Sequence, residues 1–173
     1  MKDYWLAKLI RSVEQVDSRK RLQKSIYLLQ LAGCPLKCDY LLHYYGPYSF
    51  ELAGLIDQLK GAEIIKESAD LTGYGNQRYI SQITDKGTHV LADFEKSKTG
   101  RDVYAQIKQF IPLFQQLNQE DLWVLELGAT VGYYYEGNWE VARAQAAAFK
   151  KISKNDRQLS EATELAKKYV KEG

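Results

Sequence analysis

Hydrophobic residues recur at helical spacing through much of the first sixty residues. Apolar positions three and four apart predict three helices, over residues 4–13, 19–32 and 49–60. Side chains suited to an N-cap precede the second and third of these helices, namely Asp17 or Ser18 and then Ser49. Gly33, followed by Pro35, is expected to end the second helix.

A shorter, extended pattern lies between and after these helices. Residues 40–45 are apolar and aromatic and predict a strand or a tight connection, which Gly46-Pro47 ends. Two more strands are expected over 63–66 and 78–83, with the turn-forming residues 71–76 at the tip of their hairpin. Thr84 can cap the next helix. Helix, helix, strand, helix, β-hairpin, helix is the order of a winged helix-turn-helix.

Beyond Thr99-Gly100 the pattern is helical throughout. One apolar stripe covers 103–117, with Pro112 kinking or breaking it, and helices capped by Asn118, Asn138 and Asp156 are expected over 118–135, 138–152 and 157–169. Each stripe must bury its apolar face against another element. We therefore predict an α+β fold, mostly α. It comprises a winged helix-turn-helix-like domain with a small β-hairpin over 1–98, and a C-terminal helical bundle over 99–173 packed against it.

Composition narrows the class of protein. The chain has 173 residues and a net charge of +2, and its 45% hydrophobic and 27% charged content is that of a globular protein. No run of about 18 apolar residues occurs and the first residues do not form a signal peptide, so we expect a cytoplasmic protein that binds no membrane. Tyrosine is abundant, with 13 residues, whereas there are only two histidines and two cysteines.

The usual sequence marks of an active site are missing. A nucleophilic enzyme needs a base beside its nucleophile, and no Gly-x-Ser-x-Gly motif occurs. No glycine-rich loop is followed by Lys-Ser or Lys-Thr, the pattern that holds a nucleotide phosphate. We therefore expect no catalytic residues and no cofactor.

Cys34, Cys38 and His43 form the one arrangement with metal-binding potential. Structural zinc takes four Cys or His ligands, and the only other histidine in the chain is His89. The ligand count favours two semi-buried free thiols over a metal site, and we predict no metal.

The most distinctive segment is His43-Tyr44-Tyr45-Gly46-Pro47-Tyr48-Ser49, directly before the third predicted helix. A structural interpretation puts Tyr44 or Tyr45 in the core and lets Pro47 fix the entry angle of the helix. A functional interpretation leaves His43, Tyr48 and the other tyrosine on a rigid surface. Tyrosine suits a binding surface because it offers a large area and a polar tip at a small entropic cost.

Three stretches of the sequence resemble a known family. Arg21 to Gln30, His43 to Ser49 and Leu52 to Ile65 resemble the YwgA-like family of uncharacterised bacterial proteins. They are more distantly similar to the Panacea (SocA-like) domain, whose members share a Lys-Leu helix and a Tyr-Gly-Pro turn before a helix. The resemblance covers about residues 18–90, and Leu125 to Val131 is similar to the helical part of YwgA-like proteins. Panacea domains act as antitoxins or adaptors that hold a toxin protein, so the resemblance implies protein binding without catalysis.

Basic residues support a competing hypothesis, a DNA-binding transcriptional regulator. Its contacts would come from the second helix, the third helix and the hairpin, through Arg19, Lys20, Arg21, Lys24, Gln58 and Arg78. The third helix also carries Glu51 and Asp57 outside its apolar stripe, and phosphates repel carboxylates. The same basic cluster is also typical of a solvated helix face.

The sequence therefore predicts a non-catalytic protein-binding module, antitoxin-like or an adaptor. Its partner would be a toxin or a regulated protein, bound through residues 43–49, and nucleic-acid binding would be weak. The consecutive tyrosines 133–135 suggest a homodimer, because three consecutive helical residues cannot all face the core.

Overall fold

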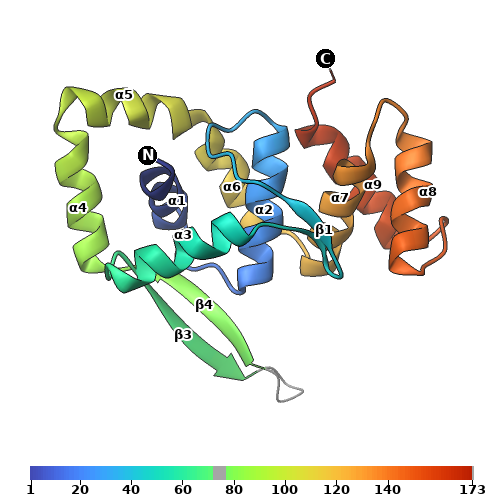
Figure 1. The fold of residues 1–173 in the computed structure, drawn as a ribbon, viewed down its shortest axis with the longest axis horizontal. Coiled ribbons are helices and arrows are strands. Elements are labelled where there is room, and N and C mark those ends of the chain that lie inside the picture. Colours follow the sequence, from blue (N-terminus) through green and yellow to red (C-terminus); the bar gives the residue numbers. More distant parts are fainter. Residues whose placement is uncertain (72–76, 173) are drawn as a thin grey trace.

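The computed structural model describes residues 1–71 and 77–172, and its first hundred residues combine helices with two small antiparallel hairpins (Figure 1). The helices there are α1 (Lys2–Arg11), α2 (Arg19–Leu31), α3 (Phe50–Gly61) and α4 (Asp85–Glu95). One hairpin pairs β1 (Leu41–His43) with β2 (Gly46–Tyr48), and the other pairs β3 (Ile65–Leu71) with β4 (Gln77–Ile83). The predicted tip of the second hairpin lies largely outside the described residues.

The rest of the described chain is mostly helical. They form α5 (Lys98–Ile107), a 3₁₀ turn, η1 (Lys108–Phe110), and then α6 (Ile111–Asn118), α7 (Leu122–Tyr134), α8 (Trp139–Lys150) and α9 (Arg157–Tyr169). The fold is therefore α+β and mostly α, as the sequence predicted. Among the described residues, no helix has the length and apolar character needed to cross a bilayer.

Helices α2 and α7 form the centre of the molecule, and they are in contact with each other. The apolar residues Leu22, Ile26 and Leu29 of α2 are completely buried, at the i, i+4, i+7 spacing of the predicted stripe. Helix α7 is buried along most of its length, from Val124 to Gly132, since it packs against α2, α8 and α9. The β1–β2 hairpin rests on both α2 and α7, which puts a short, exposed element directly over the core (Figure 1).

Most helix boundaries follow the predicted capping chemistry. The side chains of Ser18, Ser49 and Thr84 each accept a hydrogen bond from a backbone N–H in the first turn of the following helix. Gly33 follows α2 with a φ of 93°, a backbone conformation that favours glycine.

Two predictions about local structure are wrong. Asn118 does not cap α7; it ends α6, and Asp121 accepts the hydrogen bond from Val124 N that caps α7. Gly46-Pro47 does not end the short strand either. The chain turns at Tyr44 and Tyr45, and Gly46 and Pro47 lie in the returning strand β2. Pro47 is tolerated in this two-stranded hairpin because each strand has an edge without a partner strand. Proline lacks the backbone N–H, and an N–H on that edge has no ladder bond to make.

Candidate functional site

The candidate site is built on the β1–β2 hairpin. Its register pairs Leu41 with Tyr48, Leu42 with Pro47 and His43 with Gly46, so residues 44 and 45 form the tip. Gly46 has a φ of 92°, and a Cβ at this position would lie 2.7 Å from Oγ1 of Thr130 on α7. Glycine is therefore required twice over, by the backbone conformation and by the close approach to α7.

Hydrogen bonds from α2 anchor the base of the hairpin. The side-chain amide of Gln23 donates to the Ser49 carbonyl and accepts from the Ser49 N–H, both at 2.9 Å. The Ser49 hydroxyl accepts from Leu52 N in the first turn of α3. Gly46, Pro47 and Ser49 are buried, so these three predicted site residues hold the hairpin in place and cannot themselves face a partner.

Aromatic side chains follow one another along this hairpin and into the start of α3. Successive ring centroids are 5.1 Å apart for Tyr44 and Tyr45, 6.3 Å for Tyr45 and His43, 5.5 Å for His43 and Tyr48, and 5.0 Å for Tyr48 and Phe50. Tyr44, Tyr45 and Phe50 are 78%, 51% and 67% exposed, His43 is exposed and Tyr48 is half-buried. We call these five residues the aromatic ridge.

Phe50 joins the ridge although the predicted site did not include it. It is the first residue of α3 and lies outside the Leu and Ile stripe of that helix. A large apolar residue on the polar side of an amphipathic helix is the signal that could have identified it.

Beneath the ridge lies a group of charged side chains. Glu126 of α7 is only 2% exposed, and its carboxylate is 2.9 Å from Lys150 Nζ and 3.1 Å from Lys20 Nζ. Lys20 Nζ also lies 4.4 Å from the centre of the Tyr45 ring, a cation–π distance. We call Lys20, Lys24, Glu126 and Lys150 the charge cluster.

Lys24 is the most deeply buried member of the charge cluster, at 1% exposure. Its ammonium group donates to the Pro47 carbonyl at 2.7 Å. Burial, opposed by Glu126 and assisted by the neighbouring charges of Lys150 and Lys20, lowers the pKa of Lys24 to about 8. The lysine that ties α2 to the hairpin therefore titrates close to neutral pH.

The other basic residues of the predicted DNA-binding set are engaged within the chain. Arg19 contacts both oxygens of Glu67 and one of Asp57, and Arg21 is bound by Asp17 and two backbone carbonyls of residues 117 and 120. Arg78 lies 3.2 Å from Asp70 and 3.6 Å from Asp17. Gln58 is exposed on α3. The basic cluster is thus largely neutralised by acidic residues and is not a solvated basic face.

Cys34 and Cys38 are both buried free thiols, and His43 is exposed. Burial raises the pKa of each thiol to about 11, which disfavours the thiolate that would bind a metal. Within residues 1–71 and 77–172, no three His, Cys, Asp or Glu side chains are grouped as metal ligands.

Tyr133 is 38% exposed at the end of α7, and Tyr134 and Tyr135 are half-buried. Tyr135 stacks on Trp139 with ring centroids 3.9 Å apart, so part of this tyrosine cluster packs within the chain. Self-association through residues 133–135 stays a prediction.

Comparison with known proteins finds a relative of about half of the chain. No protein-family model matches the chain. The chain is 33% identical over 86 residues to the uncharacterised protein YwgA of Bacillus subtilis (strain 168), a match that covers 50% of this chain and 51% of YwgA. The matched part of the chain thus spans about half the length of this curated relative. The similarity supports the resemblance to YwgA-like proteins, whereas the resemblance to Panacea domains stays a prediction.

Proposed function

We propose that the chain is a non-catalytic protein-binding module, antitoxin-like or an adaptor, which holds a partner protein against its aromatic ridge. The observation that carries this proposal is the exposure of Tyr44, Tyr45 and Phe50 in one continuous series of ring contacts. Exposed aromatic groups are enriched at the energetic centres of protein interfaces.

The support beneath the ridge favours binding as well. Gly46 is in close contact with Thr130, and Ser49 is held by Gln23 on both its backbone groups, so the hairpin has little freedom to rearrange. A surface that is already ordered loses less entropy when a partner binds. Tyrosine hydroxyls at the hairpin tip would add hydrogen bonds at the rim of such an interface.

The alternative, a winged-helix DNA-binding regulator, receives less support. Binding to duplex DNA draws its affinity from Lys and Arg that neutralise phosphates. Arg19, Arg21 and Arg78 already contact carboxylates of the chain, and Asp57 lies on the exposed side of α3. These ion pairs would have to break before the same side chains could bind a phosphate backbone.

Photo-crosslinking in native cells tests the proposal directly. Benzoylphenylalanine in place of Tyr44 should crosslink to one defined protein, whereas the same group in place of Tyr79 should not. Tyr79 is a suitable control because it is an exposed tyrosine, 43% accessible, on β4 of the other hairpin. The partner identified in this way is then purified, and its affinity for the chain is measured.

Substitutions in the ridge should weaken this complex selectively. Tyr44→Ser, Tyr45→Ser and Phe50→Ser are each expected to reduce affinity about tenfold or more, and Tyr79→Ser should not. Equal affinity of all four variants would contradict the proposal. Tight binding to duplex DNA at physiological salt, with a steep salt dependence, would favour the regulator instead.

A further inference from the structure

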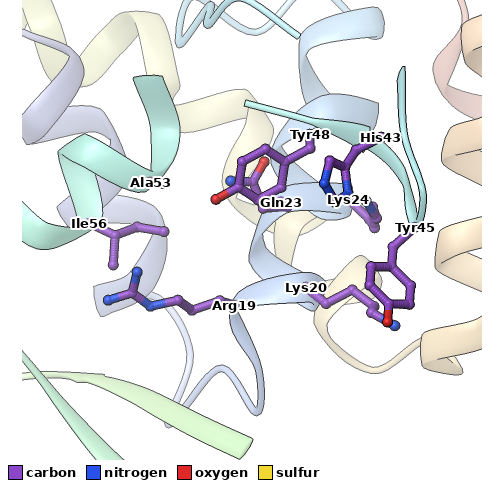
Figure 2. Close-up of a pocket in the computed structure, with 9 residues that line it drawn as sticks. All are labelled: Arg19, Lys20, Gln23, Lys24, His43, Tyr45, Tyr48, Ala53 and Ile56. Atoms are coloured by element: carbon purple, nitrogen blue, oxygen red, sulfur yellow. The ribbon is translucent and has the colours of Figure 1, made fainter. Parts of the chain in front are cut away.

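A cavity of about 150 Å³ lies between α2, α3 and the β1–β2 hairpin. His43, Tyr45 and Tyr48 form its wall on the hairpin side (Figure 2). Cavities of this volume accommodate a molecule about as large as benzene. The half-exposed Tyr45 and the exposed His43 give it access to solvent.

The charge on the cavity wall is of one sign. Arg19, Lys20 and Lys24 of α2 all line it, and none of the described lining residues is an aspartate or glutamate. In Figure 2, Arg19 and Lys20 lie on one side of the space while Tyr48 and His43 lie on the other. Arg19 is neutralised by Glu67 and Asp57. Lys20 shares the carboxylate of Glu126 with Lys150, and no carboxylate among the described residues is in salt-bridge contact with Lys24. Lys24 and the partly compensated Lys20 therefore supply the positive charge that remains available.

The charge cluster next to the cavity carries more positive than negative charge. Three lysines, Lys20, Lys24 and Lys150, surround the single carboxylate of Glu126, which contacts Lys20 and Lys150. An ammonium group has three donors, and Lys24 uses one of them, on the Pro47 carbonyl, among the residues that the structure describes. A fully buried cation with donors to spare is costly unless a further acceptor satisfies it.

We propose that this cavity binds a small oxyanion, phosphate or a carboxylate, between Lys24, Lys20 and the His43–Tyr48 wall. The bound oxygen atoms would accept hydrogen bonds from the Lys24 ammonium and from the tyrosine hydroxyls or the His43 ring. Charge-assisted hydrogen bonds of this kind are the strong ones in proteins. The anion would also offset the excess positive charge of the charge cluster. The site needs no partner protein, so its test is independent of the proposed function.

The test uses the purified chain with inorganic phosphate or acetate as the probe, at constant ionic strength maintained with chloride. NMR follows the Lys24 side chain and calorimetry measures the affinity. We expect saturable binding and a rise in the pKa of Lys24, because an anion favours the ammonium form. Acetate affinity should fall above about pH 8, where the Lys24 ammonium loses its proton. Acetate is the better probe for this arm because its charge is constant there.

Three variants identify the residues that bind. Lys24→Met and Lys20→Gln should each weaken binding about tenfold or more. Lys86→Gln removes the same charge from an exposed lysine on α4, paired with Glu63, and should bind as the wild type does. If Lys24→Met does not fold, Lys20→Gln and the wild-type Lys24 titration decide the matter. Failure of both anions to saturate, or undiminished binding in the folded Lys24→Met and Lys20→Gln variants, would overturn the proposal.

Discussion

Replacing Lys24 with methionine should change how stability depends on pH. The pKa of this lysine is about 8 in the folded protein, against 10.5 for a solvated lysine. Below pH 8 both states are protonated, and the folded state carries the full cost of a buried charge, about 3 kcal/mol for this pKa difference. Between pH 8 and 10.5 Lys24 keeps its proton in the unfolded chain but not in the folded one, so its contribution to the free energy of unfolding rises with pH.

Methionine removes both the buried charge and its hydrogen bond. The variant avoids the cost of burying a charge, about 3 kcal/mol at pH 7, but it loses the hydrogen bond to the Pro47 carbonyl, which is worth about 2 kcal/mol from a charged donor. We therefore expect Lys24→Met to be at least as stable as the wild type at pH 7. Its advantage should decrease by about 2 kcal/mol between pH 7 and 9.5 and reverse sign in that interval.

Urea denaturation at a series of pH values, followed by tryptophan fluorescence, measures this difference. Other groups also titrate in the interval, among them the buried thiols, but they act alike in both proteins and cancel in the difference. The groups that face Lys24 are Lys20 on its own helix, Glu126 on α7, Lys150 on α8 and His43 on β1. A difference that varies by less than about 0.5 kcal/mol over the interval would refute the assignment.

Three further substitutions test the support of the hairpin and the buried groups. Gly46→Ala should destabilise the fold by about 2 kcal/mol or more, measured by thermal unfolding, because its φ of 92° is strained for alanine and the Cβ meets Thr130. Glu126→Gln should cost about 3 kcal/mol or more in urea denaturation, because the lysines of the charge cluster lose their carboxylate, and an NMR titration should find the pKa of Lys24 lowered further. The stability of the wild type relative to the Cys34→Ala/Cys38→Ala variant should fall above pH 9, because the unfolded thiols ionise there but the folded ones, with pKa values of about 11, do not.

The sequence predicted well the features that depend on neighbouring residues. Ser18, Ser49 and Thr84 cap helices because a cap needs only a side-chain oxygen and the next turn of the backbone. The apolar stripe of α2 was predicted for the same reason, since its period is local. The hairpin turn was missed because Tyr44 and Tyr45 are not typical turn residues.

The environment of the basic cluster could not be predicted because its partners are distant in sequence. Arg19 pairs with Glu67 and Asp57, which lie 48 and 38 residues further along the chain. Lys20 pairs with Glu126 on α7. In the folded chain, Arg19 and Lys20 therefore form ion pairs with distant acidic residues, although their pattern in the sequence is typical of a solvated basic helix face. Only the tertiary contacts of these side chains, with Glu67 on β3 and Glu126 on α7, decide between the two interpretations.

The effect of phosphate on stability distinguishes a binding role of Lys24 from a purely structural one. A buried lysine carries the cost of its buried charge in the free protein whether it only holds the hairpin or also lines an anion site. Only in the second role does a bound anion relieve part of the cost. Both roles therefore predict the same stability for Lys24→Met at pH 7, and they differ in the effect of phosphate. The anion site predicts that phosphate stabilises the wild type and not the variant, whereas a purely structural role predicts no effect on either protein.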